Sequence, residues 1–467
     1  MQRLARESSL FKGIARLNLQ SLDTHENKTP GEAYLAAALE LWLAICSISL
    51  IASTAGLWFP TWLAVDFPAS AFIDGLQSVP LGLDCWLSVA LLIGWILIAL
   101  SGCFSIRRGS TSNRKLVFAA STVVFVSGIA LVVLNQHRLQ PWHYQGLLFL
   151  LILRITPLLA QRQQLQWLVI SIYFYSAVSK SDFQFAHTVG QDLLQATLQF
   201  FPGLGDTEAY WRLVWVIPAV ELFVAFLLVF PKTRLLGAFM ACCLHGVLVI
   251  ILGPAGLGHS LGVLIWNAHF IGVILLLFVA PLPAAVRAEM LHDTNHSGAS
   301  PVQNAGLYLT RFVIGAAMLM PLTERLGFWD HWPSWALYAP HSSRVEVRIS
   351  TTSTERLPES LQDCLAEFRE EDLWVRVPIA AWSLEQTGAP IYPQARFQWA
   401  IATQIARHID SDFEIQAEYW PTASRWTGER EKSIQTGSSD IRQFASHFRL
   451  GCQPRVAQPL KTPANDP

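Results

Sequence analysis

Charge is scarce in this chain of 467 residues. Only 14% of the residues are Asp, Glu, Lys or Arg, whereas soluble domains carry about a quarter. Hydrophobic residues make up 52% of the chain, and its mean hydropathy is +0.35. The net charge of -1 gives no electrostatic basis for binding nucleic acid. This composition excludes an ordinary soluble domain and predicts a polytopic membrane protein, with the lipid bilayer as its first partner.

Ligand motifs and cysteine pairs are also missing. The seven cysteines include no CxxC, and we find no glycine-rich phosphate loop, haem pair or zinc ligand spacing. Because His245, His259 and His269 do not share one helix face, we predict no metal. Residues 1–30 are polar and lack a short apolar core, so we expect no cleavable signal peptide there. Cys364 and Cys452 could pair if the tail is extracytoplasmic.

Long apolar runs dominate the first 320 residues. A membrane-spanning helix needs about 20 apolar residues. Nine runs are candidates, but the fourth, fifth and ninth are short, so eight or nine spans are predicted. The runs cover residues 35–57, 83–104, 116–134, 144–160, 165–180, 212–230, 235–253, 262–281 and 306–321.

Basic residues are rare in one set of the connecting loops. The loops on the N-terminal side carry 13 Lys and Arg residues and the opposite loops carry three, Arg138, Lys180 and Arg212. The positive-inside rule therefore predicts a cytoplasmic N-terminus in the cell inner membrane. An odd number of spans places the C-terminus outside.

The tail changes character after about residue 340. Apolar residues alternate at 344–350, 373–379 and 413–420, as in half-buried strands, while 358–371 and 393–409 have helical periodicity. We therefore predict a bundle of eight or nine transmembrane helices with a small extracytoplasmic α+β domain. The expected parts are a cytoplasmic segment at 1–34, the bundle at 35–322, the α+β domain at 340–454 and a disordered tail at 455–467.

The segment YFYSAVSKSDFQF ends an apolar run on a lysine. Tyr173, Ala177 and Lys180 share one helical face, and Asp182 follows two residues later. A lysine kept away from water loses its proton more easily, so Lys180 could act as a base towards a phenol or hydroquinone. Alternatively, Lys180 snorkels to the interface and pairs with Asp182.

Three further polar features lie in or beside the apolar runs. The loop Asn135–Gln145 contains His137, Arg138 and His143, which could line a polar pocket facing Lys180 or belong to an ordinary solvated loop. Glu221 and His245 lie within predicted spans, where ionisable groups are costly and need partners. Glu221 could pair with His245 or Arg154, and His245 could relay protons or make a structural hydrogen bond.

The segment around Lys180 resembles the one that carries the catalytic lysine in vitamin K-dependent gamma-carboxylases, whose bacterial relatives are HTTM proteins. The shared features are the aromatic pair Tyr173–Phe174, Ala177–Val178, Lys180 and Asp182. The resemblance implies a catalytic Lys180, a later span with a histidine such as His245, and an extracytoplasmic C-terminal region. Ser179 replaces a second lysine and the tail is short, so carboxylation of a protein substrate is not implied.

The chain is also similar to DoxX-like and MauE-like membrane proteins, which carry a glutamate early in a later span, as Glu221 does here. That group is linked to quinone and thiol redox chemistry. The leading hypothesis is a quinol-linked redox enzyme with catalytic Lys180, Asp182 and His245. In it, substrate binds at an outer-leaflet pocket with the five side chains Tyr173, His137, Arg138, His143 and Glu221.

Two other classes of protein remain open. One is a non-catalytic membrane subunit or scaffold that docks a periplasmic partner through the tail. The other is a transporter, which is the least favoured because paired breaks in the apolar runs are missing.

Overall fold

The computed structural model describes residues 30–108, 114–156, 158–201, 207–281, 301–367, 372–409 and 411–455. Within these ranges the chain is mainly helical, with two small sheets. Most of the expected N-terminal segment (1–29) and most of the expected disordered tail (456–467) lie outside the described residues.

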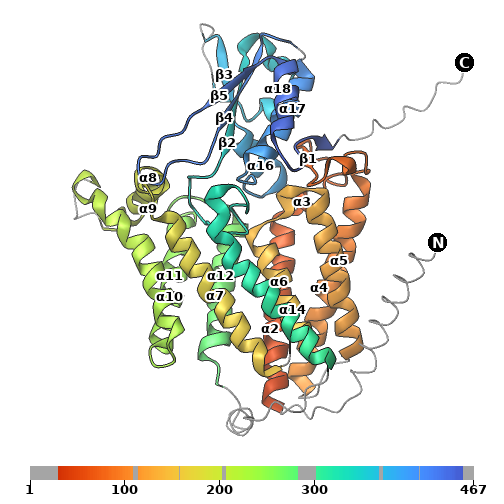
Figure 1. The fold of residues 1–467 in the computed structure, drawn as a ribbon, viewed down its shortest axis with the longest axis vertical. Helices are drawn as coiled ribbons and strands as arrows, with labels where there is room; N and C mark the ends of the chain where they lie inside the picture. The colour runs from red at the N-terminus through yellow and green to blue at the C-terminus, as the bar shows by residue number, and fades with distance from the viewer. Residues whose placement is uncertain are drawn as a thin grey trace, which may run out of the picture.

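Seven helices of the described chain are long and apolar enough to cross a membrane, so the protein is a multi-pass membrane protein. They run roughly parallel and form a bundle (Figure 1). The fourth span joins residues of a 3-10 turn (Thr207–Trp215) to α10. The helices of the seven spans are α2 (Pro30–Ser53), α4 (Gly82–Arg108), α5 (Arg114–Leu134), α10 (Val216–Val229), α11 (Arg234–Leu252), α12 (Leu261–Ile274) and α14 (Pro301–Leu319).

Two further helices lie inside this bundle, α6 (Pro141–Ile155) and α7 (Leu158–Lys180). α6 has only 15 residues, and α7 opens with a polar stretch that includes Arg162 and Gln166. These polar groups are satisfied locally, because both donate to the carbonyl of Leu277, at 2.8 and 2.7 Å. Leu277 belongs to the π-helical turn Leu275–Val279, whose wider turn changes the usual pairing of backbone carbonyls.

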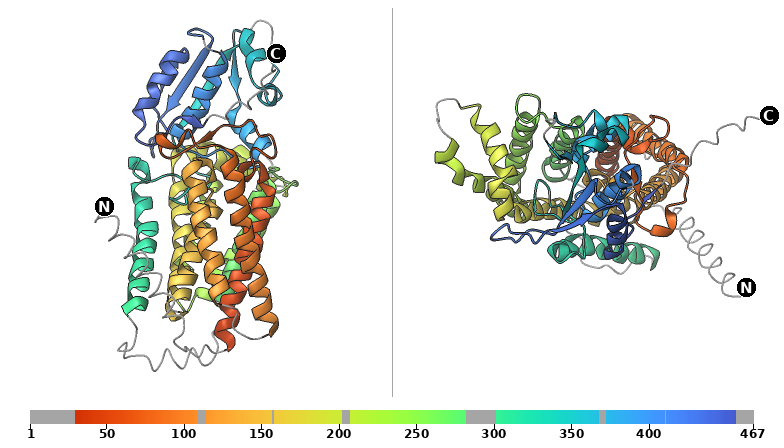
Figure 2. Two further views of the ribbon diagram at one scale, coloured as in Figure 1. Left: turned by 90° about the vertical axis from the view of Figure 1, so that its right-hand side faces the viewer. Right: turned by 90° about the horizontal axis from the view of Figure 1, so that it is seen from above.

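The C-terminal region, residues 344–455, sits on one end of the bundle (Figure 2). α2 begins at the opposite end. The region has a four-stranded antiparallel sheet in the order β3-β2-β4-β5, with Val347 of β2 opposite Val377 and Ala417. The strands are β2 (Arg344–Ser350), β3 (Trp374–Val377), β4 (Ile415–Trp420) and β5 (Ser433–Thr436).

The sequence located most of these elements. The predicted strands at 344–350, 373–379 and 413–420 are confirmed, and the helix predicted at 393–409 is α17 (Ala395–Ile409). The helix predicted at 358–371 is wrong in length: α15 covers only Glu359–Gln362, and residues 368–371 lie outside the described chain. The helices α16 (Ile379–Thr387) and α18 (Ser438–Phe444) and the strand β5 were not predicted.

A buried ion triad joins the C-terminal region to the bundle. The chain's last described strand, β6 (Pro454–Arg455), pairs with β1 (Ala69–Ser70) in the loop after α2. Arg455 Nη1 and Arg138 Nη1 both contact Asp84 Oδ2, at 2.9 and 2.5 Å, and the side chains are fully buried. Arg455 is therefore not part of a disordered tail, contrary to the prediction.

Cys364 and Cys452, which could have paired in an extracytoplasmic tail, are both free thiols. Cys364 Sγ donates to Glu385, and Cys452 Sγ donates to the carbonyl of Arg396.

His137 also lies where the C-terminal region contacts the bundle. Its Nε2 is 2.9 Å from the carbonyl oxygen of Pro390, and its ring packs against Phe67 and Phe397. Burial lowers the pKa of His137 to about 4, despite the hydrogen bond to Pro390. The imidazole is therefore neutral in the folded protein at neutral pH.

We expect Asp84→Asn to destabilise the protein by about 3–5 kcal/mol, because two buried guanidinium groups lose their counter-charge. Thermal unfolding of the full chain in detergent, followed by tryptophan fluorescence, measures the loss. Arg376→Gln is the control, since its side chain is 68% exposed and its ion pair with Glu346 should contribute little. Equal melting temperatures for both variants would contradict the role of the triad.

His137 should make the protein less stable in mild acid. Its folded pKa is below its ordinary value of about 6.5, so the unfolded chain binds the extra proton and stability is complete only above about pH 6.5. The loss develops as pH falls towards 4 and reaches about 3 kcal/mol. His137→Gln should flatten this part of the curve of melting temperature against pH, whereas His447→Gln, at an exposed site, should not.

Candidate functional site

Lys180 is the last residue of α7 and is only 2% exposed. Its Nζ donates to Glu221 Oε2 on α10 at 2.9 Å, and to the carbonyl and hydroxyl oxygens of Ser176 at 3.0 and 2.5 Å. The amine therefore has three acceptors and a counter-charge within the bundle. The Lys180 side chain is shielded from water, as predicted, but its amine forms an ion pair with Glu221.

The partner of Lys180 is Glu221, and the expected pairing with Asp182 is wrong. α7 ends at Lys180, and Asp182 has extended backbone angles, so its side chain no longer follows the face of the helix. Asp182 Oδ1 instead accepts from the backbone N–H of Phe185 at 2.8 Å and caps α8 (Phe183–His187). Its other oxygen contacts Arg325 at 2.6 Å and His341 at 2.9 Å.

A connector from the C-terminal region covers the end of α7. The chain between β4 and β5 descends from the sheet to α8 (Figure 1). Arg425 there donates to the carbonyls of Val178 and Ser181, at 3.0 and 3.2 Å, which satisfies acceptors that a helix end leaves free. Gly428 has a φ of +70°, and a Cβ there would lie 2.3 Å from the Phe183 ring. The connector therefore packs closely against Phe183, just beyond the end of α7.

A second polar chain lies two helical turns from Lys180 on the same face of α7. Tyr173 Oη is 2.7 Å from His245 Nε2, and His245 Nδ1 is 2.9 Å from Asn267 Oδ1. The Asn267 amide nitrogen donates to the carbonyl of Val263. The network assigns the Nδ1–H tautomer to His245, which accepts at Nε2 from the tyrosine. Helices α7, α11 and α12 are thereby linked inside the apolar bundle.

The loop Asn135–Gln145 does not form the expected mouth of a pocket around Lys180. Arg138 binds Asp84, and His137 binds the C-terminal region, as described above. The His143 ring packs against Trp58, with its Nε2 3.5 Å from the carbonyl of Gly128. The polar side chains of this loop attach the C-terminal region and neighbouring helices. The sequence could not reveal these contacts, because Arg138 and Asp84 are 54 residues apart and His137 and Pro390 are 253 apart.

Other expected contacts are also replaced. Arg154, considered as a partner of Glu221, pairs with Glu40 at 2.6 Å. A cavity of about 400 Å³ lies beside α9 (Val189–Leu198), with Asp192, His259 and Tyr338 in its wall. Lys180 is not among the residues that line this cavity.

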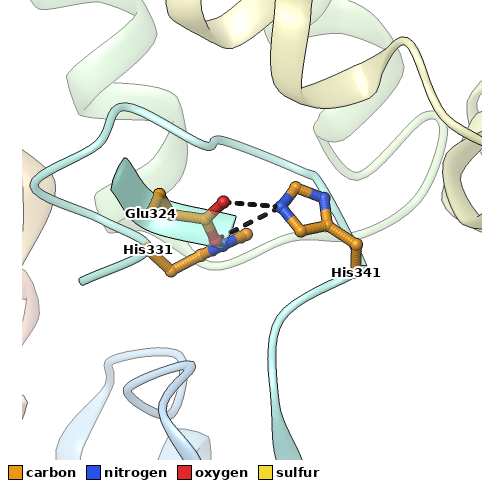
Figure 3. A group of neighbouring side chains, drawn as sticks. All are labelled: Glu324, His331 and His341. Atoms are coloured by element: carbon orange, nitrogen blue, oxygen red, sulfur yellow. Dashed lines mark hydrogen bonds and ion pairs between the residues drawn. The ribbon is translucent and has the colours of Figure 1, made fainter. Parts of the chain in front are cut away.

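The structure brings together three residues for which the sequence predicted no role (Figure 3). Glu324 lies in the 3-10 turn Met320–Leu326 after α14, and His331 and His341 lie in the connector to β2. His331 Nδ1 is 2.9 Å from Glu324 Oε1, and His341 Nε2 is 3.1 Å from Glu324 Oε2. The available signal was one acid and two histidines within 18 residues, between the last predicted span and the tail.

His341 also contacts Asp182, so the cluster reaches the end of α7. Burial lowers the pKa of His341, but hydrogen bonds to Asp182 and Glu324 outweigh it, and the net shift is upward. Burial raises the pKa of Asp182, and contacts with His341, the Phe185 N–H and Arg325 outweigh it, so the net shift is downward. Asp182 is therefore an anion. It pairs with His341 of this cluster and not with Lys180.

Comparison with known proteins gives one match. Residues 149–261 match the family model for MauE, methylamine utilisation protein MauE. The matched part runs from α6 to the start of α12 and contains Lys180, Glu221 and His245. No curated protein and no solved structure matches the chain. Over these residues, less than a third of its length, this multi-pass membrane protein is similar to MauE.

Proposed function

We propose that this protein is a membrane subunit of the MauE-like type that presents its C-terminal region to an extracytoplasmic partner. In this proposal α6 and α7 cross the inner membrane together with the seven spans described above, which makes nine. The N-terminus is cytoplasmic and the C-terminal region lies outside. The excess of basic residues in the loops on the N-terminal side supports this orientation.

The closure of the bundle around Lys180 is the observation that carries the proposal. Glu221 neutralises the amine, and the connector with Arg425 covers the helix end that bears it. The polar loop that was expected to open a pocket instead binds the C-terminal region. The end of the bundle near Lys180 is therefore closed. It supports the C-terminal region and, among the described residues, leaves no open site for a substrate beside the amine.

The far end of the sheet offers a surface for a partner. Leu373 and Phe413 are 77% and 82% exposed. They flank the end of β2, because Thr351 N donates to the carbonyl of Leu373, and Ser350 N donates to the carbonyl of Glu414. Exposed aromatic and aliphatic side chains close together favour protein contact.

We expect a photo-cross-linking amino acid at position 413 to give one discrete adduct in intact cells, since the proposed partner covers the end of the sheet. The same label at Arg376, an exposed position on β3, is the control and should give much less of it. Adduct formation is read by denaturing gels and mass spectrometry. No adduct at 413, or equal adducts at both positions, would contradict the docking surface.

A second candidate function is proton transfer to or from a lipid-soluble quinol, with Lys180 as base. It is favoured by the buried Lys180–Glu221 pair and by the Tyr173–His245–Asn267 chain on the same face of α7. If Glu221 held the shared proton, the neutral amine could accept one from a hydroquinone hydroxyl. The connector bearing Arg425 would have to move aside to admit the quinol.

Variants of the ion pair separate these two candidates. Lys180→Met and Glu221→Gln should each lower the free energy of unfolding, Lys180→Met by about 3–5 kcal/mol, because one buried charge loses its partner. The double variant Lys180→Met/Glu221→Leu should recover most of this loss. Lys232→Met, at an exposed site in the α10–α11 turn, is the control.

The subunit proposal predicts that the double variant also keeps its cross-linked partner. A quinone that co-purifies with the wild type and is lost from the folded double variant would instead support the proton-transfer function.

A further inference from the structure

A cluster of imidazole and carboxylate groups lies outside the Lys180 pair. The ligating atoms of Glu324, His331 and His341 all lie within 4.8 Å of one another. The two histidines are buried, and the Glu324 side chain is 10% exposed. The three side chains converge from the end of α14 and from two points of the connector to β2 (Figure 3).

The donor set fits a divalent transition metal. Two imidazole nitrogens and one carboxylate oxygen are a set that binds zinc with a fourth position open. Metal–ligand bonds of about 2.0–2.2 Å place the ligand atoms of a tetrahedral site about 3.3–3.5 Å apart. The contacts of Glu324 with His331 and His341 are 2.9–3.2 Å, a few tenths of an ångström shorter than in such a site, and all the ligating atoms lie within 4.8 Å of one another, so an ion fits after side-chain movement alone.

The surrounding contacts orient both rings for this role. Asp182 Oδ2 is 2.9 Å from His341 Nδ1, so a proton on Nδ1 leaves the lone pair of Nε2 directed at Glu324. Carboxylates and carbonyls commonly fix metal-binding histidines in this way. The His331 ring likewise bonds the backbone of Ala339, and its Nδ1 faces Glu324. Asp182 is itself held by the Phe185 N–H and Arg325.

We propose that Glu324, His331 and His341 bind one divalent transition-metal ion of the zinc class, with Asp182 as the residue that positions His341. The ion would fasten the connector between α14 and β2 beside the end of α7. The proposal differs from the prediction that the chain binds no metal, which considered only His245, His259 and His269. The site does not depend on the proposed membrane-subunit function.

The test uses the full chain in detergent, with any affinity tag removed. Elemental analysis should find one zinc per chain. After chelation, Co²⁺ should restore one equivalent with the visible d–d absorption of a tetrahedral ion, and added Zn²⁺ should displace it. Zinc should also raise the melting temperature of the chelated protein. A wild-type chain without bound metal and without the Co²⁺ spectrum would overturn the proposal, whatever the variants do.

Variants identify the ligands and the positioning residue. His331→Gln and His341→Gln should abolish the Co²⁺ spectrum, and His447→Gln, an exposed histidine elsewhere in the C-terminal region, should leave it unchanged. Asp182→Asn should keep one ion but weaken zinc binding about 10–100-fold, as measured against a chromophoric chelator. Folded His331 and His341 variants that bind Co²⁺ with the wild-type spectrum would assign the metal to other residues and overturn the site.

Discussion

The carboxylate of Asp84, held between Arg138 and Arg455, is the contact on which the position of the C-terminal region depends. All three groups are buried, so the two guanidinium groups are tolerable only while the carboxylate lies between them. Arg455 is contributed by the last described strand, and Asp84 opens α4. The C-terminal end of the described chain is thereby joined to the start of α4, which fixes the C-terminal region over the bundle.

The position of the C-terminal region then determines the environment of Lys180. The connector between β4 and β5 can reach the end of α7 only because the sheet stands on that end of the bundle. Arg425 satisfies the last carbonyls of α7, so water is not needed there. With water kept out, the amine of Lys180 requires a counter-charge, and Glu221 on α10 supplies it.

The sequence predicted those features that depend on local pattern. Apolar length located seven of the predicted spans, and alternation located β2, β3 and β4, because both signals are carried by neighbouring residues. Pairings across the fold were not predictable in this way. The spacing of Lys180 and Asp182 indicated a pair, but the helix ends between them and turns the two side chains apart. The polar loop at 135–145 was predicted to line a pocket because its partners, Asp84, Pro390 and Arg396, are distant in the sequence.

The cluster of Glu324, His331 and His341 could not be predicted from the sequence for a similar reason. They lie between a predicted span and a predicted strand, in a connector with no periodicity, and histidines 10 residues apart follow no ligand spacing. Only folding onto the end of α7 places Asp182 behind His341. The segment from Lys180 to Asp182 thus divides two charge systems. The lysine turns into the bundle and is neutralised by Glu221, while the aspartate turns out to the connector and organises the histidines. Two residues of chain suffice for this division because α7 ends between them, so the ending of one helix determines which charges meet inside the bundle and which meet in the connector to β2.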